Sequence, residues 1–286
     1  MNPAKRILAR LMDATGLSRG LLELQARALR RHARALNYHD VPPSRAADFE
    51  RQLCFYAERF APVGRGEVAE LLRGEWPHPR PGLLLSFDDG LRSHAEVVAP
   101  LLERYGFPGW FVVPTAFVDA PAGEQPAFAA AHQIHYAAEY GDPRAAMSWE
   151  QVRDLDRRHV IGCHTASHQR LRADLGPARL DTEIRGSKAR LEAMLGHEVD
   201  VFAWVGGEEW AYSAEAARVV RASGFRLGLM TNNAPIRPGQ DPLQLQRTNV
   251  EASDPDPVLR FQLSGFLDLV YLPKRRRVNR LTCLGA

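Results

Sequence analysis

The sequence predicts an α/β protein built on a parallel sheet, either open or closed into a barrel. Two observations support this fold class. Short apolar runs of strand length alternate with segments of helical periodicity over most of the 286 residues. Where strand, helix and strand follow one another at this spacing, the two strands pair in parallel and the helix crosses the sheet.

The first ninety residues are predicted to form helix, then a link, then strand. Residues 3–36 carry leucines at helical intervals among arginines, and Pro42 and Pro43 stop regular structure after them. Residues 46–60 return to helical periodicity. A Pro- and Gly-rich link then precedes the apolar run at 83–87, which suits a buried strand.

The alternation continues through the middle of the chain. We expect strands at 110–114, 159–163, 199–205 and 225–230, and helices at 93–105, 148–158, 177–195 and 213–223. Residues 119–147 break the pattern with clusters of Pro, Gly and Ala, so we expect them to form a surface insertion.

Charge is distributed unevenly along the chain. The formal net charge is +3, but residues 1–36 carry +6 and residues 271–286 carry +5, which leaves −8 for residues 37–270. We therefore divide the chain into a basic helical extension at 1–36, an α/β domain at 37–260 and an apolar and basic tail at 261–286. Basic ends on an acidic body predict peripheral contact with an anionic membrane, or alternatively terminal helices in solvent. No recognition motif favours nucleic acid.

The sequence also bears on the compartment. No apolar run approaches the roughly 18–20 residues that cross a bilayer, and the N-terminal residues lack the apolar stretch of a secretory signal. Cys54, Cys163 and Cys283 show no paired spacing, which is typical of reduced thiols. We expect a cytoplasmic protein, with peripheral contact at the inner face of the membrane as an option.

Two acidic residues end the strand predicted at 83–87. Asp88 and Asp89 stand at the carboxyl end of that strand, where parallel α/β folds place their active sites. Adjacent residues on an extended chain point in diverging directions, so the pair suits two separate tasks. One task is binding a cation, and the other is acting as a general base.

Two histidines follow the strand predicted at 159–163. His164 and His168 can be aimed at one centre by a helical turn or a tight loop. Two histidines and one carboxylate make the ligand set of a catalytic zinc site with an open position. Alone, this spacing also fits two polar loop residues. Because both motifs are predicted to lie on one rim of the same sheet, together they indicate a metal hydrolase.

The motif SFDDG at 86–90, followed by HTASH at 164–168, resembles the polysaccharide deacetylase family, also called the NodB-homology or carbohydrate esterase 4 family. Further segments extend the similarity over most of the chain, among them LNYHDVPP, FERQLCFYAERF, GFPGWFVVPTAFV, MSWEQVRDL and GFRLGLMTN. The resemblance implies a distorted (β/α)7 barrel, a divalent metal ion and hydrolytic removal of an N- or O-acyl group from a sugar. The metal is usually zinc, with cobalt, nickel or manganese as alternatives.

The resemblance also implies roles for individual residues. Asp88 matches the family's general base, and Asp89, His164 and His168 match its metal ligands. Thr165 matches a hydroxyl position that braces the histidine loop. The bound metal would polarise the acyl oxygen and activate a water, whose proton the general base would take.

Other segments depart from the family's pattern. The third motif reads FAWVGG, so the usual Arg is missing and Gly206 stands where an aromatic residue is usual. Trp204 in this motif could stack on a sugar ring or pack in the core. The family's late His is also missing, which leaves the general acid open between His39, another His and bound water. Arg247 matches a late Arg of some members and would brace the general base.

We therefore expect a metal-dependent carbohydrate deacetylase acting on an N-acylated sugar in polysaccharide, glycolipid or envelope-glycan biosynthesis. A lipid-linked sugar and a growing glycan both fit as substrates. The missing Arg and late His favour an alternative, a catalytically weak or inactive glycan-binding or scaffolding protein of the same fold. The intact DDG and HxxxH motifs favour the enzyme.

Overall fold

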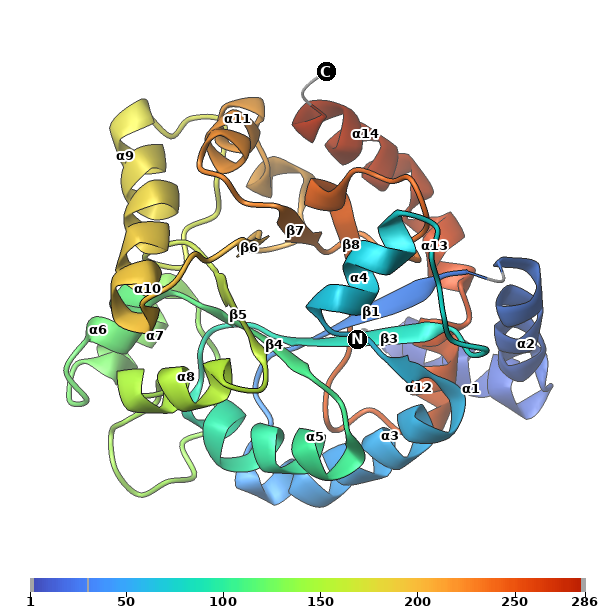
Figure 1. The fold of residues 1–286 in the computed structure, drawn as a ribbon. Helices are drawn as coiled ribbons and strands as arrows, with labels where there is room; N and C mark the ends of the chain where they lie inside the picture. Colours follow the sequence, from blue (N-terminus) through green and yellow to red (C-terminus); the bar gives the residue numbers. More distant parts are fainter. Residues whose placement is uncertain (1–2, 30, 284–286) are drawn as a thin grey trace.

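Parallel strands close into a seven-membered barrel in the computed structural model, which describes residues 3–29 and 31–283 (Figure 1). The order round the barrel is β1-β3-β4-β5-β6-β7-β8 and back to β1. The strands are β1 (Ala33–Tyr38), β3 (Gly82–Phe87), β4 (Gly109–Val113), β5 (Val160–Cys163), β6 (Val201–Ala203), β7 (Leu227–Met230) and β8 (Leu245–Asn249). The predicted (β/α)7 barrel is confirmed.

A short extra strand, β2 (Ala61–Pro62), completes the sheet without entering the ring. It pairs with the first two residues of β3, whereas β4 pairs with the last three. The two strands therefore share β3, and the closing pair of the barrel is β1 with β8.

Helices surround the strands in Figure 1 and cover the outer side of the barrel. Leu83, Leu85 and Phe87 of β3 belong to the core between strands and helices, whereas Leu84 belongs to the core inside the barrel. This alternation follows from the strand period of two, and burial on both sides explains the continuous apolar run. The outer helices are α3 (Ala46–Arg59), α5 (Ala99–Tyr105), α8 (Trp149–Asp156), α9 (Pro177–Asp181), α10 (Ser187–Leu195) and α11 (Ala214–Ala222). The helix α4 (Arg65–Leu72) instead lies across the centre of the ring in Figure 1 and contributes Val68 and Leu71 to the core inside the barrel.

Two π-helical turns extend these helices. The turn η2 (His94–Val98) leads into α5, and η3 (Thr182–Gly186) joins α9 to α10. The expected helices at 93–105 and 177–195 therefore match continuous helical segments. The insertion expected at 119–147 is partly helical, with α6 (Thr115–Asp119) before it and α7 (Gln125–His132) inside it.

The N-terminal helix predicted over 3–36 is wrong at its C-terminal end. Two helices, α1 (Pro3–Ala14) and α2 (Leu17–Leu29), precede β1, which begins at Ala33. β1 pairs with both β3 and β8, so residues expected in the extension close the barrel. Pairing with two neighbours stabilises the extended conformation over the helix that the local leucine spacing predicted.

The C-terminal segment, predicted as an apolar and basic tail, is helical and packed on the rest of the protein. It forms α12 (Asp256–Leu263), α13 (Phe266–Val270) and α14 (Leu272–Thr282), of which α12 packs against α1 and α2. Phe261 and Leu263 are fully buried. Within the described part of the chain, no helix has the length and apolar character that crossing a membrane requires.

Candidate active site

A polar layer lies inside the barrel at the carboxyl ends of β1, β3 and β8. Ser86 and Asp88 lie on the same side of β3 as Leu84, and Arg247 lies on the same side of β8 as the inward-facing Leu245. The N–H of Asp88 donates to the carbonyl of Tyr38 at 2.9 Å, so strand pairing continues through Asp88. The strand period thus directs this carboxylate into the barrel mouth.

Arg247 holds both oxygens of Asp88. Its Nη1 donates to Oδ1 at 2.6 Å and its Nη2 to Oδ2 at 3.0 Å, and Nη1 also donates to Asn37 Oδ1 and Ser86 Oγ. Both partners are buried. Burial raises the pKa of Asp88, but the charge and hydrogen bonds of Arg247 together with His164 and His39 outweigh it, so this pKa lies below its ordinary value. The carboxylate is therefore ionised and fixed in orientation at neutral pH.

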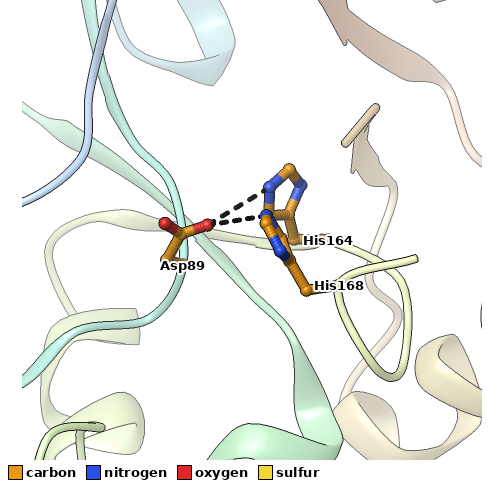
Figure 2. Close-up of side chains that lie close together, drawn as sticks. All are labelled: Asp89, His164 and His168. Carbon is orange, nitrogen blue, oxygen red and sulfur yellow. Dashed lines mark ion pairs between the residues drawn. The ribbon is translucent and has the colours of Figure 1, made fainter. Parts of the chain in front are cut away.

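The backbone turns sharply after Asp88. Asp89 has a φ of 80°, in the left-handed region that non-glycine residues rarely adopt, and Gly90 follows with a φ of 62°. Such a conformation costs roughly 1–3 kcal/mol and occurs mainly at functional sites. The turn sends the Asp89 carboxylate toward the histidine loop, where Oδ1 lies 3.1 Å from His168 Nε2 and 3.6 Å from His164 Nε2 (Figure 2).

Backbone carbonyls orient both histidines. His164 Nδ1 lies 2.9 Å from the carbonyl of Ala203, and His168 Nδ1 lies 2.7 Å from that of His132. Because a carbonyl only accepts, each Nδ1 carries a proton and each Nε2 faces Asp89 as a lone pair when the ring is neutral. Burial lowers the pKa of His164 to about 4, so that ring is neutral at pH 7. Burial lowers the pKa of His168 too, but Asp89 raises it more.

Hydrogen bonds hold the histidine loop, residues 164–169, in place. Thr165, with a φ of 63°, accepts the N–H of Gln169 on its Oγ1 at 2.9 Å. Glu183 of η3 is fully buried and accepts the N–H groups of Ala166 at 3.0 Å and Ser167 at 2.9 Å. Glu183 was not among the residues predicted for the site. Its position next to the buried Ile184 on a helical segment is the signal that could have identified it.

The Asp89–His164–His168 triad fits a divalent cation. Each residue offers one ligand atom, and the three atoms lie within 4.8 Å of one another. Bonds of about 2.0–2.1 Å in a tetrahedron place ligand atoms about 3.3 Å apart, a value that the two carboxylate–imidazole distances bracket. Asp89 Oδ1 is buried and accepts no well-aligned hydrogen bond from the described residues. A buried carboxylate oxygen in this state requires compensation, which a cation supplies.

A cavity of about 410 Å³ opens over Asp88 and the triad. It joins a second cavity of about 500 Å³, since both are lined by His39, Thr231 and Asn249. The two cavities are therefore neighbours at the mouth of the barrel.

His39 lies on the rim of both cavities, at the end of β1. Its carbonyl is 2.9 Å from Nε2 of the buried His94. The next residue, Asp40, accepts the hydroxyl of Ser93 at 2.7 Å and the N–H of Ala137 at 2.6 Å. The segment that carries His39 is thus attached both to η2 and to the insertion.

The insertion, expected to be a surface segment, also contributes to the site. The carbonyl of His132 fixes His168, and Gln133 and His135 line the cavity over the triad. The sequence does not predict the contact with His132, because every residue has a backbone carbonyl and the contact does not depend on the side chain.

The third motif contributes backbone rather than an aromatic face. Gly206 lines the cavity with a φ of 80°. Trp204 is only 2% exposed and packs against Phe202 and Tyr212, so it cannot stack on a sugar ring. Of the two roles left open for Trp204, the structure selects core packing.

Comparisons with known proteins show the family and the fold of the chain. A family model described as polysaccharide deacetylase matches residues 77–228, more than half of the chain. Over 144 residues the chain is 28% identical to the poly-beta-1,6-N-acetyl-D-glucosamine N-deacetylase of Escherichia coli strain K12. That match covers 47% of this chain and 20% of the relative, so the chain spans only about a fifth of its curated relative.

Solved structures share the fold at low sequence identity. The deacetylase PplD of Streptococcus pyogenes, in complex with acetate, aligns with a TM-score of 0.63 at 19% identity, over 81% of this chain and 98% of that one. The BpsB deacetylase domain of Bordetella bronchiseptica aligns with a TM-score of 0.61 at 20% identity, over 77% and 96%. IcaB of Ammonifex degensii aligns with a TM-score of 0.57 at 22% identity, over 82% and 97%.

Proposed function

The chain belongs to the polysaccharide deacetylase family, and from that premise we propose that it is a metal-dependent hydrolase that removes the N-acetyl group from a sugar residue of a polysaccharide or glycolipid. The observation that carries the proposal is the buried Asp89–His164–His168 triad beside an Asp88 held by Arg247, all in one cavity. A module that only binds glycans has no use for a second buried carboxylate next to a cation site.

In the proposed mechanism Asp89, His164 and His168 hold the cation. When bound, a divalent ion supplies polarisation of the acyl oxygen and activation of a water molecule. Asp88 is the general base: its Oδ2 lies 3.8 Å from His164 Nε2, at the edge of the triad, and takes a proton from the attacking water. Arg247 is a positioning residue that keeps this carboxylate ionised and aimed at the cavity.

We assign protonation of the leaving amine to His39, which lines the cavity from the end of β1. The backbone N–H of Gly206, on the same cavity wall, is the candidate donor to the developing oxyanion. These assignments supply the general acid and the oxyanion donor without the late His and the aromatic third motif of other members.

The alternative of a catalytically weak scaffold rests on the Arg missing from the third motif. Arg247 supplies a guanidinium to the proposed base from β8 instead. This contact removes one of the two reasons for expecting an inactive protein, and we favour the enzyme.

The decisive experiment measures acetate release from β-1,6-linked N-acetylglucosamine oligomers, with metal analysis of the same preparation. We expect turnover that chelation abolishes and zinc, cobalt, nickel or manganese restores. His39→Ala should lower kcat by about 10²-fold or more, while His135→Ala, a cavity-lining control, changes it little. Turnover that persists after complete metal removal would contradict the proposed mechanism.

A further inference from the structure

The N-terminal helical hairpin exposes a row of large apolar side chains. We define the α1–α2 stripe by its residues and their exposed fractions: Ile7 at 60%, Leu8 at 37%, Leu11 at 61%, Leu17 at 49% and Leu24 at 61%. Among the described residues, nine large apolar side chains are exposed, and five of them belong to this stripe. Scattered exposed leucines are ordinary, but this concentration on one hairpin indicates an interaction surface.

The hairpin that carries the stripe is attached firmly to the protein. Ala9 and Met12 of α1 are buried against Phe261 of α12 and its neighbours. Arg260 Nη2 donates to Asp13 Oδ2 at 2.8 Å. At 100° per residue, Ile7 and Leu11 project from the side of α1 opposite to Ala9 and Met12. The stripe therefore faces outward because the other face of the helix is packed, and not because the helix has frayed.

Arginines occur on the same two helices as the stripe. Arg10, Arg19 and Arg27 are exposed there, and Arg27 pairs with Glu23 at 3.7 Å. At 100° per residue, Arg10 lies beside Ile7 and Arg27 beside Leu24, whereas Arg19 lies on the other side of α2. Arg260 pairs with Asp13, so this acidic side chain of the hairpin does not offset the exposed arginines. An apolar face bordered by arginines is typical of helices that lie in the interface of an anionic membrane. The charge favours lipid headgroups over a second copy of this basic hairpin, since like charges repel.

The basic residues near the C-terminus are engaged differently. Lys274 Nζ donates to the carbonyl of Gly207 at 2.7 Å, Arg277 pairs with Glu209 at 2.9 Å, and Arg275 donates to the carbonyl of Asn232. These contacts tie α14 to the barrel. Arg276 and Arg280 remain exposed on α14, so the two basic ends differ chiefly in their exposed apolar side chains, of which the α1–α2 stripe has more.

We propose that the α1–α2 stripe is a membrane-contact surface that binds the interface of an anionic bilayer. The lipid contact is independent of the deacetylase proposal.

Flotation of the full chain with lipid vesicles tests the surface directly. We expect binding to phosphatidylglycerol–phosphatidylcholine vesicles that weakens as salt is raised, and weaker binding to phosphatidylcholine alone. Ile7→Gln combined with Leu11→Gln should lower vesicle affinity by about tenfold or more. Arg10→Gln should weaken binding to the anionic vesicles only. Leu281→Gln, an exposed leucine of α14, is the matched control and should bind like the parent chain.

Two outcomes overturn the proposal. One is equal vesicle binding, or equal absence of binding, by the parent chain and the double variant. The other is a dimer in analytical ultracentrifugation that the double variant dissociates without any vesicle binding, which assigns the stripe to a second copy of the chain. Acetate release from a soluble oligosaccharide should be the same in parent and double variant, so a failure of the deacetylase proposal is seen separately.

Discussion

At the residue scale, Asp88 and Asp89 are adjacent in sequence and differ in surroundings. Asp88 lies in extended backbone and is held by a guanidinium, whereas Asp89 lies in left-handed backbone beside two imidazoles. Asp88 is thus ionised and fixed in orientation, as the proposed base requires, and Asp89 keeps an oxygen that a cation can use. The single sharp turn between them separates the two tasks.

Asp88→Asn should separate the two tasks experimentally. The amide keeps the shape of the carboxylate but cannot accept the proton, so we expect kcat to fall by about 10²–10⁴-fold while metal content stays near that of the parent. Asp89→Asn should lose the metal as well. Metal analysis and acetate release on the same samples check this, and loss of metal from Asp88→Asn would contradict the division of roles.

Arg247→Gln tests the positioning role. Without the guanidinium the pKa of Asp88 rises, so the acidic limb of the kcat/KM profile should move to higher pH. Removing one partner of a buried ion pair should also lower the free energy of unfolding by about 3–5 kcal/mol. Arg247→Lys, which keeps the charge, should restore part of the pH profile. An unchanged acidic limb in a folded Arg247→Gln protein would refute the role.

At the element scale, the histidine loop depends on the helical segment behind it. Glu183 accepts hydrogen bonds from two backbone N–H groups of the loop and forms an ion pair with Arg179 at 2.8 Å. Two left-handed residues, Thr165 and His168, give the loop its shape at a cost in free energy. Contacts from η3 and from the carbonyl of His132 hold that shape, so the ligand geometry is a property of three elements together.

Glu183→Gln should loosen the loop without removing a ligand. An amide oxygen accepts more weakly than a carboxylate, so we expect metal affinity to fall by about 10–100-fold with the fold retained. Glu215→Gln, in an exposed pair with Arg218 on α11, is the control and should have no effect. Competition with a chromophoric chelator measures both. Equal metal affinities in the two variants would show that Glu183 does not support the proposed metal site.

At the scale of the whole molecule, the proposed metal site joins parts of the chain that are distant in sequence. Asp89 follows β3, the two histidines follow β5, and β6 and the insertion orient the rings. A cation bound there is expected to favour the closed barrel over the unfolded chain.

Zinc should therefore raise thermal stability by mass action. At free zinc about 100-fold above its Kd we expect about 2.7 kcal/mol of stabilisation, which is several degrees in Tm for a domain of this size. His168→Ala should abolish the shift, and chelation should reverse it in the parent chain. Calorimetry with and without the chelator measures the effect, and an equal shift in His168→Ala would place the zinc elsewhere.

Local pattern determined much of this protein in advance. The apolar run at 83–87 followed by two aspartates, and the strand at 159–163 followed by HxxxH, predicted both the parallel sheet and the proximity of a carboxylate and two histidines on its rim. These signals are readable because strand period, helix period and ligand spacing all act over a few residues.

Tertiary structure alone decided the rest. β8 reads LQRTN, with no apolar run to mark it, yet it closes the barrel onto β1 and brings Arg247 to Asp88 across 159 positions of sequence. The insertion supplies the carbonyl of His132, and Trp204 is buried rather than exposed to sugar. Each of these outcomes depends on which distant strands meet when the barrel closes, and pairing over such separations leaves no periodic trace in the chain.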